Sequence, residues 1–115
     1  MDPVAYLSAA SQRFLDNGDY DSAENLLSLI LSIQERNFGK SSLETTAALF
    51  NLGLLHFAQN DYAKAEEYLL RCLAIERKVL EPSSRSISET VNILTELHVE
   101  KYLSRSASKQ RALSA

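Results

Sequence analysis

The sequence predicts an all-α fold, a right-handed stack of antiparallel helix hairpins with about two and a half repeats and five to six helices. The first observation is an echo, because GDYDSAE at residues 18–24 returns as NDYAKAE at residues 60–66, a period of 42 residues. A fixed period of this size is typical of proteins that stack one supersecondary unit on the next. The second observation is that apolar residues recur at helical spacing throughout. The third is that a capping residue precedes each predicted helix.

The first predicted hairpin occupies roughly the first forty residues. Asp2 followed by Pro3 is typical of a helix N-terminus, with proline in the first turn. One face of this helix carries Leu7, Ala10 and Phe14. Residues 17–18 then close the helix, and Asp19 is expected to cap the second one. The second helix has a face made of Tyr20, Ala23, Leu27 and Ile30, and residues 37–40 form the next turn. Tyr20 and Ala23, like Tyr62 and Ala65 one period later, are expected to be buried where two helices cross.

The third helix is expected to run from about residue 42 to residue 59. Ser41 and Glu44 have the spacing of a capping box, in which side chains satisfy free backbone N–H groups at a helix start. Apolar residues lie on two sides of this helix, in one stripe of Leu49, Leu52, Gly53 and His56 and another of Phe50, Leu54 and Phe57. A helix that is apolar on most sides is buried between neighbours, so this one is predicted to be the central element.

The fourth helix repeats the pattern of the second. Asp61 is its expected N-cap, and its buried face is predicted to be Tyr62, Ala65, Leu69 and Cys72. Glu67 and Arg71 are four residues apart, which predicts an outward-facing ion pair.

The fifth helix follows a break at residues 82–85. Ser86 and Glu89 suggest a second capping box, and the apolar face continues through Ile87, Val91, Leu94 and His98. Past Tyr102 the apolar pattern decays into a serine-rich, basic segment. We therefore expect a helical domain over residues 1–102 and a partly helical or frayed end over residues 103–115.

A known repeat family has the same pattern of residues. The second unit shows Leu49, Leu52, Gly53, His56, Asn60, Tyr62, Ala65, Leu69 and Cys72, and the first shows Leu7, Ala10, Ser11, Phe14, Gly18, Tyr20, Ala23, Leu27 and Ile30. This resembles the tetratricopeptide repeat (TPR), whose usual period is about 34 residues. The longer period resembles the TPRs of kinesin light chains. HEAT and armadillo repeats run at about 40–47 residues, but the Asp-Tyr-x-x-Ala-Glu turn favours the TPR pattern.

Composition excludes several classes of function. The net charge of −3 argues against a nucleic-acid binder, and the longest apolar stretch is far too short to span a membrane. The single cysteine, Cys72, fits a reducing compartment, so a cytoplasmic protein is expected. The sequence shows no catalytic motif, no glycine-rich phosphate loop and no set of metal ligands. Cys72 is interpreted as inert core packing, and His56 and His98 as side chains packed between helices.

The resemblance implies a binding surface, because the first helix of each TPR hairpin lines a concave groove. The predicted partner-binding residues are Gln12, Phe50, Asn51, Leu54, Phe57, Glu89, Asn92 and Glu96. The middle of this groove is apolar and one wall is acidic, so an apolar or basic-amphipathic segment of a protein or peptide is the expected ligand. Two interpretations of Phe50, Leu54 and Phe57 stay open, since the same residues suit a groove or the core.

The sequence thus predicts a non-catalytic protein-interaction module, an adaptor or scaffold that binds a partner segment on its concave helix face. The alternative is a small structural subunit or assembly factor stabilised within a larger complex. An enzyme is disfavoured because no catalytic constellation is present. The third unit retains a recognisable first helix only. Either the fifth helix therefore acts as the cap of the stack, or another chain covers Ile93, Leu97 and Val99, through self-association or a bound partner.

Overall fold

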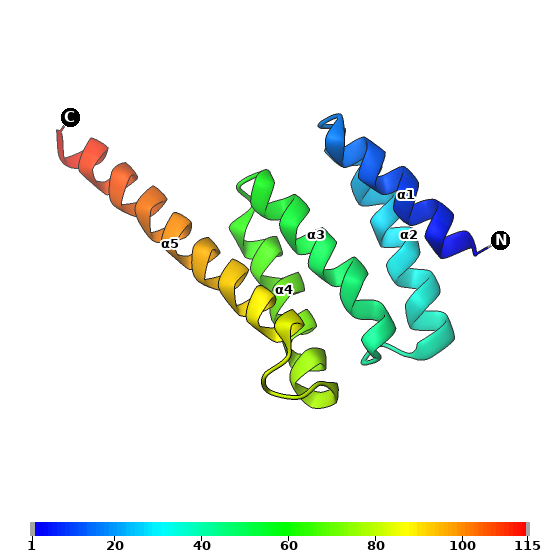
Figure 1. The fold of residues 1–115 in the computed structure, drawn as a ribbon. Coiled ribbons are helices and arrows are strands. Elements are labelled where there is room, and N and C mark those ends of the chain that lie inside the picture. The colour runs from blue at the N-terminus through cyan, green and yellow to red at the C-terminus, as the bar shows by residue number, and fades with distance from the viewer. Residues whose placement is uncertain (1, 115) are drawn as a thin grey trace.

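The chain is a stack of antiparallel helix hairpins, as predicted (Figure 1). The computed structural model describes residues 2–114, which form five α-helices, one short 3-10 turn and no strand. In order these are α1 (Pro3–Asp16), α2 (Tyr20–Phe38), the 3-10 turn η1 (Leu43–Thr45), α3 (Thr46–Ala58), α4 (Tyr62–Val79) and α5 (Arg85–Ser114). The all-α class is confirmed, with five helices in the described residues.

The helices form two layers. Helices α1, α3 and α5 lie in the front layer of Figure 1, with α2 and α4 behind them. Within each hairpin, α1 packs on α2 and α3 packs on α4, while α2 also contacts α3 and joins the two hairpins. The last helix, α5, packs mainly against α4 rather than α3. As a result, α3 and α5 face each other across the front layer without close packing.

The 42-residue repeat is visible in the backbone. The Asp19 carboxylate accepts a hydrogen bond from the Ser22 amide at 3.2 Å, and the Asp61 carboxylate accepts one from the Lys64 amide at 3.3 Å. Before each cap the chain turns with positive φ, at Gly18 (+75°) and Asn60 (+62°). Glycine and asparagine are the residues that adopt this conformation most readily, so both turns follow from local chemistry.

The helix crossings fall at the two predicted alanines. Ala23 and Ala65 are each fully buried, which leaves no room for a larger side chain between the helices. Tyr20 and Tyr62 were expected to be buried too, and this is wrong, because both are half-buried. The hydroxyl of Tyr62 donates to Asn60 Oδ1 at 3.2 Å in the exposed turn. A tyrosine at a hairpin end buries its ring and keeps its hydroxyl in water.

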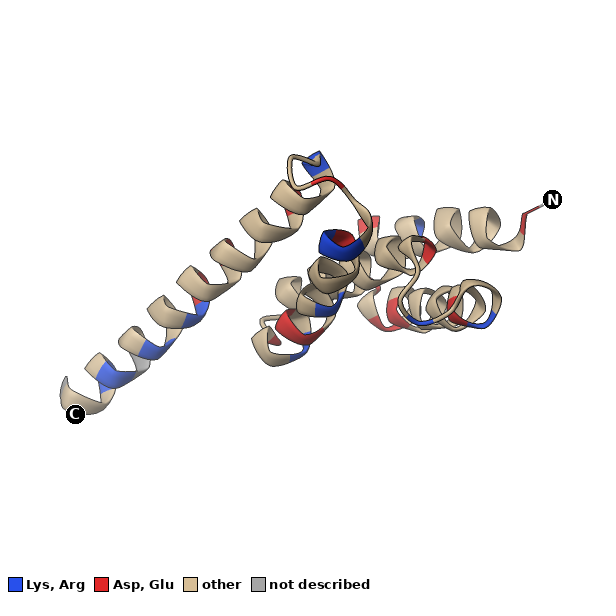
Figure 2. Ribbon diagram, turned by 90° about the horizontal axis from the view of Figure 1, so that it is seen from below, with Lys and Arg blue, Asp and Glu red and all other residues tan. Residues whose placement is uncertain are grey.

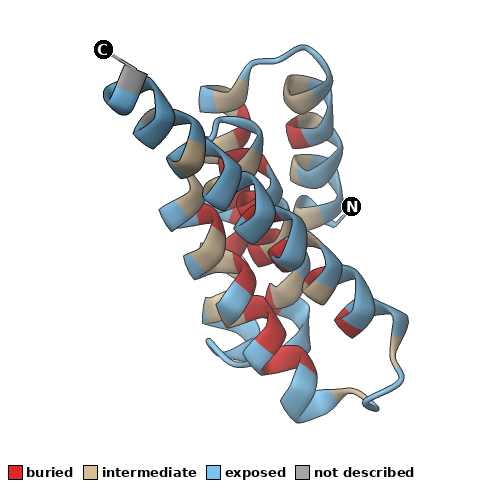
Figure 3. Cartoon of the chain, turned by 90° about the vertical axis from the view of Figure 1, so that its left-hand side faces the viewer, coloured by how far each residue is buried: buried red, intermediate tan, exposed pale blue. Residues whose placement is uncertain are grey.

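Figure 3 shows the buried residues along the packed helices of the stack. The core consists of two clusters. The first lies among α2, α3 and α4 and contains Ala23, Leu27, Ile30, Leu31, Ala48, Leu49, Leu52, Leu55, Cys72 and Ile75, with side chains of α1 packed against it. The second joins α4 to α5 and contains Ala65, Leu69, Leu73, Ile87, Leu94 and Leu97. Because Leu97 is completely buried by α4, α5 acts as the last packed layer of the stack.

Both predicted capping boxes are wrong. The chain enters α3 through η1, and Ser42 before that turn makes no side-chain capping hydrogen bond. Helix α5 begins at Arg85, so Ser86 already lies inside the helix. Glu89 instead accepts a hydrogen bond from Arg85 Nε at 3.0 Å. A capping box requires the serine to stand just outside the first turn, and the position of these helix starts removes that condition.

The outward pair between Glu67 and Arg71 is also wrong. The Arg71 guanidinium lies 3.0 Å from Glu35 Oε2 and donates to the backbone carbonyl of Lys40, also at 3.0 Å. Arginine can serve several acceptors at once because its donors form a rigid planar fork. The side chain therefore ties α4 to the end of the first hairpin.

The second half of α5 projects beyond the body of the stack (Figure 1). The helix continues without interruption to Ser114. Tyr102, Leu103 and Leu113 are exposed on it, Tyr102 at 70%. No helix in the described residues is both long enough and apolar enough to cross a membrane.

Candidate interaction surface

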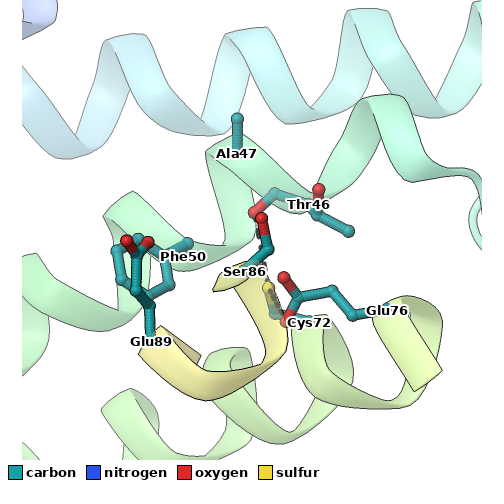
Figure 4. A pocket seen from close by; sticks show the side chains of 7 residues that line it. All are labelled: Thr46, Ala47, Phe50, Cys72, Glu76, Ser86 and Glu89. Atoms are coloured by element: carbon teal, nitrogen blue, oxygen red, sulfur yellow. Dashed lines mark hydrogen bonds between the residues drawn. The ribbon is translucent and has the colours of Figure 1, made fainter. Parts of the chain in front are cut away.

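The groove between α3 and α5 contains two cavities. The first, which we call the Glu76 cavity, has a volume of about 200 Å³ and lies where α3, α4 and the first turns of α5 meet (Figure 4). Its lining comprises Thr46, Ala47 and Phe50 of α3, Cys72 and Glu76 of α4, and Ser86 and Glu89 of α5. This lining combines one aromatic ring with two carboxylates, so the cavity is suited to a group that is both apolar and positively charged.

The second cavity lies further along the same groove. This Val99 cavity has a volume of about 390 Å³ and is lined by Phe57 of α3 and by Thr95, Glu96, Val99 and Glu100 of α5. Val99 is 51% exposed, so its apolar surface is open to solvent. The cavity has an apolar floor and an acidic wall, the composition expected from the sequence.

Phe50 and Phe57 belong to the core and to the groove at once. Both rings are half-buried. Phe50 packs against both core clusters and also lines the Glu76 cavity. Phe57 packs against the second cluster, meets the Tyr62 ring edge-on at 6.0 Å and lines the Val99 cavity. For these two rings, both the groove and the core interpretations therefore apply. Leu54, in contrast, is 36% exposed and belongs to the surface.

The remaining predicted residues are spread more widely. Leu54 and Asn92 are exposed on the faces of α3 and α5 between the two cavities, as their helical spacing from the lining residues requires. Asn51 is exposed next to Phe50 and lines neither cavity. Gln12 lies on α1, where its amide donates to Asp16 Oδ1 at 3.0 Å. The structure thus brings Phe50, Phe57, Glu89 and Glu96 to the groove walls and leaves Gln12 outside it.

Glu76 was not predicted as a site residue. Its side chain is 4% exposed and accepts a hydrogen bond from the Thr90 hydroxyl at 2.7 Å. The helical period of α4 could have identified Glu76 from the sequence, because residues 65, 69, 72 and 76 share one face and only the last is charged. A charged residue at a position where the period requires an apolar one marks either a polar core or a binding site.

Charge is distributed unevenly along α5 (Figure 2). The half that faces α3 carries Glu89, Glu96 and Glu100, whereas the projecting half carries Lys101, Arg105, Lys109 and Arg111. The acidic half supplies one wall of the groove. Electrostatic complementarity favours a cationic partner there and disfavours an anionic one.

Cys72 is buried and chemically quiet. It is 1% exposed, and burial followed by the negative charge of Glu76 raises the pKa of its thiol to about 12. The thiolate is the reactive form of cysteine, so a raised pKa suppresses nucleophilic and redox chemistry. The interpretation of Cys72 as a packing residue fits this environment.

His56 joins three helices. It is 3% exposed and stacks on Tyr68 of α4, with ring centroids 5.6 Å apart. Its Nε2 lies 3.2 Å from Glu24 Oε1 of α2, although without hydrogen-bond geometry, and Nδ1 lies 3.7 Å from Asp61 Oδ2. His98 was expected to be packed as well, and this is wrong, since its side chain is 61% exposed beside Glu66. In the described part of the chain, no three metal-ligating side chains cluster together.

The chain is similar to known proteins in both sequence pattern and fold. Residues 5–78 match the family model described as tetratricopeptide repeat. Among solved structures, the chain is similar to the crystal structure of BtubC (BKLC) from P. vanneervenii, with a TM-score of 0.77 and 20% sequence identity. The similarity covers 97% of this chain but 48% of BtubC, so this chain spans about half the length of that protein. No curated protein sequence matches the chain.

These findings agree with the backbone. The family match covers nearly all of both hairpins, α1–α2 and α3–α4, with their paired aspartate caps and buried alanines. The structural similarity, at this low identity, establishes the fold alone and extends it over α5. The chain is therefore a member of the tetratricopeptide repeat family.

Proposed function

We propose that this chain is a non-catalytic protein-interaction module that binds a segment of a partner protein in the groove between α3 and α5. Family membership supports the general role, because TPR domains bind protein partners. The observation that carries the proposal is the pair of cavities along one groove, each combining a phenylalanine from α3 with a glutamate from α5. We place the module in the cytoplasm, in keeping with its single buried thiol.

The spacing of the cavities favours a helical partner segment. Phe50 and Phe57 are seven residues apart, and so are Glu89 and Glu96. Two helical turns span about 10 Å, since each residue rises about 1.5 Å. A partner helix that lies along the groove therefore presents side chains at i and i+7 to the two cavities. Its side chains should be apolar or basic, because the floor is aromatic and the wall is acidic.

A selection from a random-peptide display library tests this proposal. Peptides that bind the wild-type chain are then measured against Leu54→Lys, which places a positive charge between the two cavities and removes apolar surface there. Leu54 is exposed, so the change leaves the core intact. We expect affinity to fall by about tenfold or more, since truncating an interface anchor commonly costs about 2 kcal/mol.

Leu70→Lys is the matched control. Leu70 is 48% exposed on α4, outside both cavities. This variant introduces the same charge on the same residue type and should bind the peptides as the wild type does. Equal loss in both variants, or no loss in either, would place the binding surface elsewhere.

The second candidate function is a structural subunit or assembly factor. Exposed apolar side chains on the projecting half of α5, namely Tyr102, Leu103 and Leu113, favour it, because such a surface is commonly covered in an assembly. Self-association of this chain is the simplest assembly that would cover these side chains. Sedimentation velocity over a wide concentration range tests it, with Leu103→Ser as the variant that should shift the equilibrium toward monomer. A monomer at every concentration removes the self-association form of this candidate.

A further inference from the structure

Glu76 is a buried carboxylate without a positively charged partner. It is 4% exposed, and none of the ion pairs found among residues 2–114 includes it. Figure 4 shows its side chain reaching from α4 toward Ser86 and Thr46, into the cavity between the three helices. Burial of a charge is costly unless the charge is paired and hydrogen-bonded. The folded chain alone therefore supplies no cation to this carboxylate. Among the described residues, the one enclosed side-chain polar atom without a hydrogen bond is His56 Nε2, so the second Glu76 oxygen is open to the cavity.

The hydrogen-bond donors around Glu76 are too few. Thr90 has one hydroxyl hydrogen and two acceptors in reach, Glu76 Oε1 at 2.7 Å and the Ser86 carbonyl at 3.0 Å. Cys72 has one weak thiol donor, placed 3.5 Å from the same Oε1 and 3.6 Å from the Thr46 carbonyl. Even when both donate to Glu76, they serve one oxygen. No hydrogen bond found in the described residues reaches Oε2, although a carboxylate can accept about four.

The cavity beside Glu76 has room and suitable walls for the missing partner. Its volume of about 200 Å³ is several times the ~30 Å³ that a water molecule occupies in the liquid. Glu89, which is exposed, adds a second carboxylate at the rim, and the Phe50 ring forms part of the apolar wall. Lysine and arginine have a long apolar stem and a charged head, a combination that matches an aromatic wall leading to a carboxylate.

We propose that the Glu76 cavity receives one lysine or arginine side chain of the partner segment. The cationic head donates hydrogen bonds to Glu76 Oε2 and Glu89, and the stem packs against the Phe50 ring. This inference rests on the proposed function and deepens it, because it assigns one position of the partner segment to a cationic residue. The Val99 cavity, two helical turns away, receives the apolar side chain that follows at i+7.

Nuclear magnetic resonance titration with acetyl-arginine N-methylamide tests the cavity directly. The control probe is acetyl-citrulline N-methylamide, which has nearly the same shape but no charge. With the wild type, the amide signals of residues 86–90 and of Phe50 should shift and saturate with the arginine probe only. Equal shifts with the citrulline probe would overturn the proposal, because they would show that charge does not matter.

Glu76→Gln is the decisive variant, since it keeps the acceptor for Thr90 and removes the charge. We expect its affinity for the arginine probe to fall by about tenfold, the loss typical of one charge-assisted hydrogen bond. Its melting temperature should equal or exceed that of the wild type, because a largely buried charge without a cationic partner has gone. A lower melting temperature with unchanged affinity would mean that Glu76 is a structural polar group, and the proposal would fail.

Two further variants complete the design. Glu81→Gln makes the same charge change at an exposed position before α5 and should bind the probe like the wild type. Glu89→Gln changes only the rim and should weaken binding even if Glu76→Gln does not fold. Library peptides that lose affinity with Leu54→Lys but carry no lysine or arginine would overturn the cationic pocket while leaving the proposed function standing.

Discussion

Cys72 shows how one residue links packing to chemistry. It occupies the position of Ile30 in the first repeat, 42 residues earlier, and both side chains are buried in the first cluster. The sequence predicts this packing from the helical period alone. What the period does not reveal is the neighbour one turn later, Glu76, whose charge adds to burial in raising the pKa of the thiol.

We predict that Cys72 in the folded protein resists alkylation at pH 8 and reacts fully once the chain is unfolded. Burial raises its pKa from 9.0 to about 12, so almost no thiolate is present in the native state. The contribution of this group to the free energy of unfolding is fully present below pH 9 and is lost as the pH rises toward 12, because only the unfolded thiol ionises in that window.

Iodoacetamide labelling with and without urea measures the protection of the thiol from alkylation. Urea titrations at pH 8 and pH 10 measure the pH dependence of the free energy of unfolding. Cys72→Ala provides the control, since its stability should depend less on pH in this window. Rapid labelling of the folded wild type at pH 8 would contradict the buried placement.

At the scale of whole elements, the sequence predicts helix faces better than helix ends. The caps at Asp19 and Asp61 were predicted correctly because a single side chain satisfies its own local amides. The serine–glutamate boxes failed because the starts of α3 and α5 depend on packing, which no short motif encodes. The groove between α3 and α5 was only partly predictable, since it depends on α5 packing against α4.

The contact between α3 and α4 yields a prediction at Gly53. A Cβ atom added there would lie 2.6 Å from Leu69 Cγ, and Leu69 is completely buried and cannot easily move. Gly53→Ala should therefore lower the free energy of unfolding by about 1–3 kcal/mol, the usual cost of overpacking. Helix propensity alone predicts the opposite sign, a gain of about 1 kcal/mol. Urea denaturation of the wild type and the variant distinguishes the two expectations. A more stable variant would show that α3 and α4 are packed less tightly at Gly53 than in this structure.

Across the whole molecule, helix packing decreases from the two complete hairpins toward the end of α5. The first core cluster joins the two complete hairpins, whereas the second holds α5 through its first half alone. Beyond residue 100 the side chains of α5 are exposed or half-buried wherever their burial is described. We propose that the stable domain comprises residues 1–102 and that residues 103–115 form a separate basic end.

A chain that stops at Tyr102 should accordingly melt within a few degrees of the full chain. None of the side chains whose burial is described in the removed part belongs to either core cluster. Circular dichroism at 222 nm follows both the melt and the loss of helical signal expected from the shorter α5. A large drop in the melting temperature would instead mean that the projecting half stabilises the body, as an interface between two copies would do.

The sparse packing between α3 and α5 has a mechanical consequence. These two helices belong to successive repeats, and their relative orientation is transmitted mainly through α4, which contacts both. A ligand that fills both cavities would contact α3 and α5 at the same time and hold the two helices in a fixed relative orientation. Binding should then reduce the motion of α5 relative to α3 and make the stack more rigid, so that a displacement of α5 is transmitted more directly to the first hairpin. In such a protein, the partner would help to set the curvature of the solenoid.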